Sequence, residues 1–204
     1  MERLHLKLAA GNGGQGGSGS DVDPRQVPAF EVDVRAFGWE ERRLGHVQAT
    51  LAKDPQGLRL ARFESALPET TISAHGDWLV MPVGQRTRLS AELVSTDLSA
   101  TSRSLGLPGA IEAKHARAEA NLNWSGGPVG DFVPRLNGTL SIDIERGQLR
   151  DVKPGAGRML GLTSLVELPR RLSLDFHDVT DKGLAFDTIK GNFEIRDGNA
   201  YTDD

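Results

Sequence analysis

A glycine-rich tract near the N-terminus is the first segment whose residue types could do chemistry. It reads "AAGNGGQGGSGS", residues 9–20, and loops of this composition can hold phosphate when a G-K-[ST] sequence closes them and a helix follows. Neither feature follows here. Since Gly/Ser tracts are ordinarily linkers, we predict a flexible loop and no nucleotide site.

The 5 histidines are the next candidates, as metal ligands. They fall on separate expected strands, without the H-x-x-x-H or H-E-x-x-H spacing that places two ligands on one helix face; they are His5, His46, His75, His115 and His177. In "DFHD", residues 175–178, Asp175 and His177 would share one face of a strand, but no third ligand is near in sequence. We therefore predict solvated histidines, no metal and no cofactor.

Nucleophilic catalysis has equally little support. The chain has no cysteine and no G-x-S-x-G sequence, and "WSGG", residues 124–127, is followed by Pro128 and is typical of a turn. Carboxylates recur on most expected polar faces, so their presence alone does not indicate a glycoside hydrolase. The sequence predicts that this protein is not an enzyme.

Three arginines belong to a segment unlike the rest, "GAGRMLGLTSLVELPRRLSLDF", residues 155–176. The favoured interpretation is a helix over residues 157–168 that packs into the open end of a sheet and ends at Pro169. The alternative makes Arg158, Arg170 and Arg171 a cluster that contacts lipid phosphates, because guanidinium groups match phosphate geometry.

The elements that position these residues are expected to be strands. Apolar and polar residues alternate with period two in most segments, and turn residues such as "DPQG", residues 54–57, separate them. Expected strands cover residues 1–8, 30–35, 46–51, 58–60, 65–75, 78–82, 87–95, 111–124, 139–145, 171–177, 184–189 and 193–196. A second short helix is expected over residues 97–105, with Thr96 or Asp97 as N-cap and Gly106 after its end.

This pattern predicts a mainly β fold: a curved antiparallel sheet of hairpins with two short helices. Strands that are apolar on one side make a sheet with one dry face, which a second sheet, a helix or an apolar ligand must cover. The helical material is too short to cover it all. We expect either a sandwich or an apolar groove.

Composition narrows the class further. The chain has 204 residues, of which 38% are hydrophobic, and a net charge of -4, which argues against nucleic-acid binding. No stretch has the length of a transmembrane helix or of a signal-peptide apolar region. We expect an N-terminal strand and Gly/Ser loop over residues 1–26 and a β region over residues 27–204.

The run of residues 154–204, from "PGAGRML" to "NAYTDD", closely resembles the C-terminal signature of the YhdP branch of the AsmA-like envelope proteins. The segments "HGDWLV" (75–80), "STDLSATSRSLGLPGAIEAKHARAEANLNWSGGPVGDF" (95–132) and "LNGTLSIDIERGQLRDV" (136–152) resemble the same family. The resemblance covers most of the chain from about residue 32 and weakens in the glycine-rich loop.

The resemblance implies a bridge-like lipid-transfer architecture with an apolar β groove. Such proteins are anchored in the inner membrane of gram-negative bacteria, extend through the periplasm, and pass phospholipid toward the outer membrane, supporting its permeability barrier. It also implies that this chain is a fragment with further strands after Asp204. The partners implied are phospholipid and an outer-membrane or other envelope protein.

Residue parity supplies the candidates for the floor of such a groove: Leu140, Ile142, Ile144, Leu172, Leu174, Phe176, Phe193 and Ile195. An ordinary core beneath the helix at residues 157–168 explains them equally well. A structural or docking module that pairs through an open sheet edge, without lipid, is the alternative function.

Overall fold

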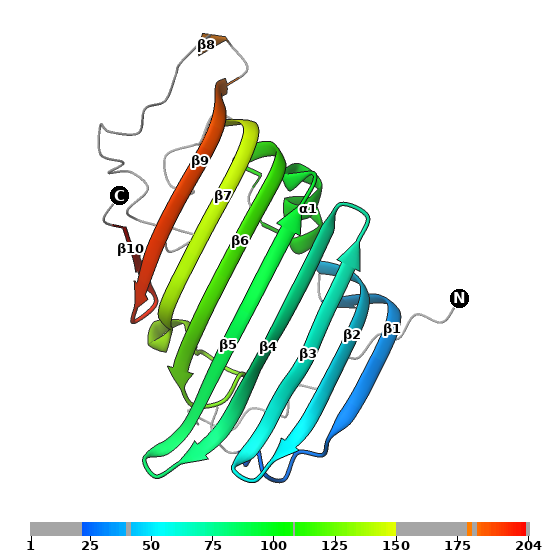
Figure 1. The fold of residues 1–204 in the computed structure, drawn as a ribbon, viewed down its shortest axis with the longest axis vertical. Coiled ribbons are helices and arrows are strands. Elements are labelled where there is room, and N and C mark those ends of the chain that lie inside the picture. Colours follow the sequence, from blue (N-terminus) through cyan, green and yellow to red (C-terminus); the bar gives the residue numbers. More distant parts are fainter. Residues whose placement is uncertain (1–21, 40–41, 108, 150–178, 181–182, 203–204) are drawn as a thin grey trace.

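The computed structural model describes residues 22–39, 42–107, 109–149, 179–180 and 183–202. These residues form one antiparallel sheet, one α-helix and one 3-10 turn (Figure 1). The strands are β1 (Phe30–Trp39), β2 (Arg42–Asp54), β3 (Gly57–Leu67), β4 (Thr70–Met81), β5 (Gly84–Ser95), β6 (Ile111–Ser125), β7 (Asn137–Leu149), β8 (Val179–Thr180), β9 (Gly183–Arg196) and β10 (Asn199–Tyr201). The helix α1 is Leu98–Leu105 and the 3-10 turn is Val133–Arg135.

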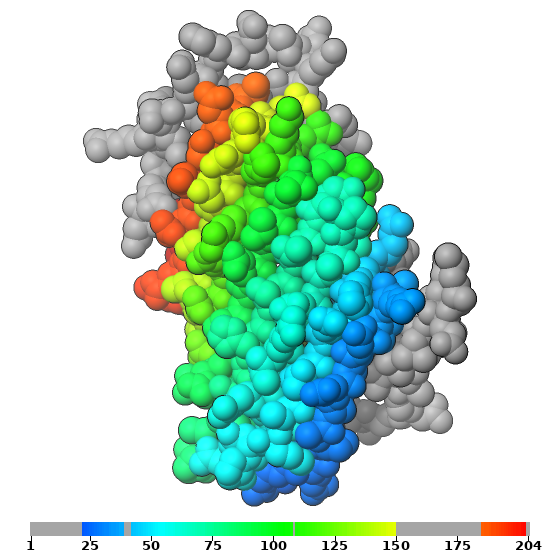
Figure 2. Space-filling model, turned by 45° about the vertical axis from the view of Figure 1, so that its right-hand side comes forward, coloured from blue at the N-terminus to red at the C-terminus, as the bar shows by residue number. Residues whose placement is uncertain are grey.

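The order of strands in the sheet follows their order in the sequence. The path is β1-β2-β3-β4-β5-β6-β7-β9-β10, and the short β8 also pairs with β9. The colours accordingly pass from blue to red across the sheet in Figure 1 and across the molecular surface in Figure 2. The mainly β, open antiparallel fold expected from the alternation is confirmed.

The strands give the sheet two chemically different faces, because successive side chains of a strand point to opposite sides. The register places apolar residues of neighbouring strands opposite one another: Ala49 faces Phe63, and Ala91 faces Ala120. Polar residues occupy the other face in the same way, as where Glu92 faces Glu119. The apolar face predicted from the sequence is therefore continuous across the sheet.

Helix α1 covers one end of this apolar face. Asp97 is its N-cap and accepts a hydrogen bond from the backbone N–H of Ala100 at 2.9 Å, while Gly106 ends the helix in the left-handed conformation with φ 64°. The predicted helix and both of its caps are confirmed. Leu98 packs on a buried cluster of Ala113, Ala116, Ile144 and Phe186.

Helix α1 connects strands that are far apart in the sheet. It contacts both β6 and β2, which are four strand spacings apart, or about 19 Å in a flat sheet. In Figure 1 it lies near one end of these strands. One helix of 8 residues thus packs against both halves of the sheet.

The other end of the apolar face is covered by two irregular segments. Trp124 is buried, stacks on Phe132 with ring centroids 4.9 Å apart, and donates a hydrogen bond from Nε1 to the carbonyl oxygen of Gly127 at 2.8 Å. Residues 22–27 lie against the same end, where Gln85 donates to the carbonyl oxygen of Val22 at 3.0 Å. Both ends of the apolar face are thus covered, and within the described ranges its middle is not.

Several strand predictions were wrong in detail. Residues 65–75 are not one strand, because Pro68 and Glu69 form the turn between β3 and β4, and β3 joins residues 65–67 to the strand predicted at residues 58–60. Alternation continues through that turn, so the pattern does not reveal it, although proline is a turn residue. Conversely, β4 continues through residues 76–77, and β9 joins residues 184–189 to 193–196.

The glycines that suggested breaks at those two places have another reason to be there. A Cβ on Gly76 would lie 2.2 Å from the carbonyl oxygen of Arg88, and one on Gly191 would lie 2.8 Å from the ring of Phe193. Both glycines admit a close approach inside a strand. The helix predicted over residues 157–168 and the strands predicted over residues 1–8 and 171–177 lie outside the described residues.

Candidate functional site

The polar face of the sheet holds no catalytic constellation within the described ranges. His46 Nε2 lies 2.7 Å from Asp33 Oδ1, and Gln48 donates to Asp33 Oδ2 at 2.9 Å, so both side chains serve to hold one exposed carboxylate. These hydrogen bonds, from Gln48 first and then His46, lower the pKa of Asp33. No group of three or more His, Cys, Asp or Glu suited to a metal ion occurs among these residues.

Several charges on this face are held in ion pairs between neighbouring strands. Arg88 pairs with Asp77 at 2.7 Å, Lys190 with Asp143 at 2.8 Å, and Arg117 with Glu92 at 2.8 Å. The hydrogen bond that Arg88 donates to Asp77 raises the pKa of Arg88, and the one that Lys190 donates to Asp143 raises the pKa of Lys190. Exposed pairs of this kind add little stability, but they leave the face polar and solvated.

The apolar face is organised in three rows that run across the strands, at right angles to the chain direction. One row is Val34, Val47, Ser65, Ile72, Leu93, Ala118, Ile142 and Gly191. The next is Val32, Ala49, Phe63, Ala74, Ala91, Ala120, Leu140 and Phe193. The third is Phe30, Leu51, Leu60, Gly76, Leu89, Leu122, Gly138, Ile195 and Ala200.

The residues in the middle of these rows are only half-buried. Partial solvent exposure remains at Ile72, Leu89, Leu93 and Ile142. Residues at the two covered ends are buried, as at Trp124, which is 5% exposed, and Ile144, which is 7% exposed. A closed core buries its large aliphatic side chains far more completely. The centre of the apolar face is therefore surface that nothing in the described part of the chain covers fully.

Alanines make the central part of one row small. Ala74, Ala91 and Ala120 lie side by side on β4, β5 and β6, between the larger Phe63 and Leu140. An alanine side chain projects only one carbon from the backbone. Each of these three positions therefore brings only a methyl group to the apolar face.

The structure brings five of the predicted floor residues together on β7 and β9. Leu140 faces Phe193, and Ile142 faces Gly191, on adjacent strands. Ile144 and Phe193 are buried, with only 7% of each residue exposed, whereas Leu140, Ile142 and Ile195 are half-buried. Leu172, Leu174, Phe176, Arg158, Arg170 and Arg171 lie outside the described residues.

The residues that β4 and β5 contribute to the apolar face were not among the predicted floor residues. Ile72 and Leu93 face each other in the same row as Ile142, and Ala91 sits beside them. Their alternation was visible in the sequence, as was that of Ala116, Ala118 and Ala120. What parity could not supply was the register that joins these strands to β7.

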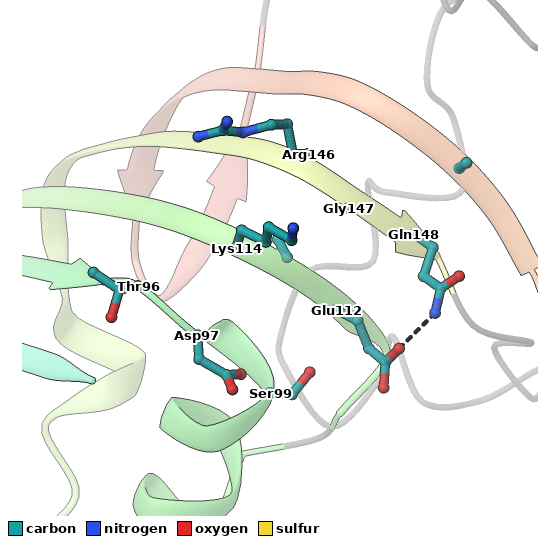
Figure 3. A pocket seen from close by; sticks show the side chains of 10 residues that line it. Thr96, Asp97, Ser99, Glu112, Lys114, Arg146, Gly147 and Gln148 are labelled. Atoms are coloured by element: carbon teal, nitrogen blue, oxygen red, sulfur yellow. Dashed lines mark hydrogen bonds between the residues drawn. The ribbon is translucent and has the colours of Figure 1, made fainter. Parts of the chain in front are cut away.

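A hollow of about 400 Å³ opens where α1 meets the ends of β6 and β7 (Figure 3). Asp97 and Ser99 come from the N-terminal end of the helix, and Glu112, Lys114 and Arg146 come from the strands. Gln148 donates a hydrogen bond to Glu112 at 2.6 Å, drawn as the dashed line in Figure 3. The hollow joins the buried end of the apolar face through Ala113.

Together these features define a class of protein: an open antiparallel sheet with a solvated, ion-paired face and an apolar face left half-covered. A large accessible apolar surface in a folded domain marks a binding site. The apolar face is therefore the candidate binding surface of the described part of the chain.

Comparison with known proteins gives the family. The family model described as YhdP protein matches residues 1–204, and the chain belongs to that family. It is 30% identical over 134 residues to the "Intermembrane phospholipid transporter YhdP" of Escherichia coli (strain K12), an alignment that covers 65% of this chain and 11% of the relative. No solved structure matches.

The chain spans about a tenth of the length of this relative. The relative is named as a transporter and not as an enzyme. Among the described residues, no helix has the length and apolarity needed to cross a membrane.

Proposed function

We propose that this chain forms part of the path along which a periplasm-spanning protein moves phospholipid between the inner and outer membranes. Acyl chains lie on the apolar face and headgroups stay at its polar rim. The observation that carries the proposal is the half-burial of the three apolar rows in the middle of the sheet. The name of the Escherichia coli relative supports phospholipid as the cargo.

The direction of the rows suits transport. Each row crosses the strands from β1 to β9 without a charged residue among its described members, over seven strand spacings or about 34 Å. Each methylene group that leaves water for such a face gains about 0.8 kcal/mol. A chain that moves from one strand to the next exchanges one apolar contact for another, so it never returns fully to water.

The predicted floor residues Leu140, Ile142 and Ile195 take part in this surface in our proposal, together with Ile72, Ala91 and Leu93. The whole protein, anchored in the inner membrane of a gram-negative bacterium, would then support the permeability barrier of the outer membrane. This placement in the cell envelope follows the intermembrane role named for the relative.

The test is native mass spectrometry with lipid extraction of the chain expressed in the periplasm. Leu93→Asp places a charge on the apolar face, and Ala91→Trp places a large ring where Ala74, Ala91 and Ala120 present only methyl groups. Val94→Asp is the matched control, because Val94 is the next residue of β5, is exposed at 39%, and faces Arg117 on the other side of the sheet. We expect co-purified phospholipid in the wild type and Val94→Asp, and its loss in Leu93→Asp and Ala91→Trp with the circular dichroism spectrum retained.

A folded wild type that carries no lipid would overturn the proposal, as would equal lipid in all four proteins. The docking-module alternative would then be favoured. The open side of β1, which pairs only with β2 among the described strands, would be the edge available for it.

A further inference from the structure

Two like charges lie on adjacent strands where β6 and β7 reach the hollow beside α1. Lys114 and Arg146 occupy corresponding positions of β6 and β7, between the pairs Ala113–Gly147 and His115–Glu145. Like charges on adjacent strands of a sheet repel each other. Elsewhere in the described sheet, Arg88, Arg117 and Lys190 each reach a carboxylate on a neighbouring strand.

No acidic partner neutralises this pair within the described residues. Two carboxylates also line this hollow, and their hydrogen bonds go to other groups: Asp97 accepts from the N–H of Ala100, and Glu112 accepts from Gln148. Lys114 and Arg146 are both exposed. The hollow therefore holds two cations whose hydrogen-bond donors are free for a ligand.

The backbone departs from regular alternation at this point. Ala113 and Ala116 are both buried, three positions apart, and the residues between them are exposed. On the facing strand, Arg146 has φ 55°, a left-handed conformation that is uncommon for a residue with a side chain. This break lets charged residues line a hollow that also contains Ala113, at the end of the apolar face.

We propose that Lys114 and Arg146 bind the phosphate group of a lipid whose acyl chains extend onto the apolar face. The inference rests on the proposed lipid path and adds the place on this chain where the phosphate binds and the two side chains that hold it. Ammonium and guanidinium groups form charge-assisted hydrogen bonds to phosphate oxygens. The hollow of about 400 Å³ is open to water, as a headgroup that carries charge requires.

The test uses short-chain probes that remain monomeric in water, titrated into the purified chain by calorimetry. Dihexanoyl phosphatidic acid carries the phosphate, dihexanoyl glycerol has the same chains without it, and inorganic phosphate has no chains. The variant is Lys114→Gln with Arg146→Asn, because asparagine tolerates the left-handed conformation. Arg35→Gln with Arg86→Gln removes the same charge from two exposed positions on β1 and β5.

We expect the Lys114/Arg146 variant to bind phosphatidic acid at least about tenfold more weakly, and to bind dihexanoyl glycerol unchanged. The Arg35/Arg86 control should bind both as the wild type does. Equal loss of phosphatidic acid in both variants would overturn the proposal, since net charge would then explain it. Inorganic phosphate that binds the wild type as tightly as phosphatidic acid would also overturn it, as a free-phosphate site.

The two proposals fail separately in this experiment. If the lipid path exists without the headgroup site, Leu93→Asp abolishes dihexanoyl glycerol binding while Lys114→Gln with Arg146→Asn leaves phosphatidic acid binding unchanged. If neither probe that carries acyl chains binds the folded wild type, the lipid path itself is wrong and the headgroup site fails with it.

Discussion

Three buried hydroxyl groups attach the helix to the sheet at the level of single residues. Thr101 of α1 lies 2.5 Å from the hydroxyl of Thr70 and 2.7 Å from that of Ser95, and the three residues are 1–3% exposed. Hydroxyl groups without partners at such sites are costly. The small contact area of an 8-residue helix is thus supplemented by directed bonds.

Thr101→Val keeps the shape of the side chain but removes its hydroxyl. We expect the free energy of unfolding to fall by about 1–3 kcal/mol, because Thr70 loses its partner beneath the helix. Chemical denaturation followed by circular dichroism measures this. Thr71→Val is the control, because Thr71 is the exposed neighbour on the other face of β4, and an equal loss there would contradict the role of the hydroxyl cluster.

The carboxylate of Asp33 gives a prediction for pH. Its pKa in the folded protein lies below the ordinary value of 3.8 because Gln48 and His46 hydrogen-bond to it. A lowered pKa stabilises the fold above the unfolded value, and this contribution is lost as pH falls through the folded value. Asp33→Asn should therefore lower the Tm near neutral pH and match the wild type at about pH 2, as scanning calorimetry across this range would detect. A gap in Tm that does not change with pH would contradict this origin.

At the level of elements, the cap of α1 could be predicted with accuracy from sequence. Asp97 and Gly106 are types that favour the two ends of a helix for local reasons, and both are found there. The period-two strands were predicted for the same reason, since alternation is a local property. The turn at Pro68 and the continuity of β9 through Gly191 depend instead on what lies across the sheet, which a single strand does not reveal.

The candidate site followed the same division. Parity placed Leu140 and Ile142 on one face, yet the half-burial that makes this face a candidate surface depends on what covers it. The segments that cover it are α1, the loop around Phe132 and residues 22–27, and their positions do not follow from parity. The corresponding positions of Lys114 and Arg146 likewise require the register of β6 against β7, which the sequence does not state.

Removing the helix cap should loosen one end of the apolar face. Asp97→Ala is expected to destabilise the protein by about 1 kcal/mol, because the N–H of Ala100 loses its acceptor. Asp97→Ser, which retains a capping oxygen, should recover most of the loss. Thermal unfolding of the two variants makes the comparison, and equal Tm values would show that the cap contributes nothing.

For the whole molecule, protection from hydrogen exchange should follow position in the sheet. The amides of β5 lie between β4 and β6, whereas those on the open side of β1 have no partner strand in the described structure. We expect β5 to exchange far more slowly than alternate amides of β1, measured by exchange and mass spectrometry. Equal protection would mean that a partner covers the edge at β1, as the docking alternative requires.

Because the strands follow one another in the sheet in the order of the sequence, the sheet can be widened by adding hairpins. From β1 to β7 each strand pairs with its neighbours along the chain, so inserting one hairpin between two turns adds two strand spacings, about 10 Å, without repacking distant segments. The width of the sheet and the length of the sequence then scale together, as they do in solenoid repeats. The width of such a sheet becomes a quantity that evolution, or an engineer, can adjust one hairpin at a time.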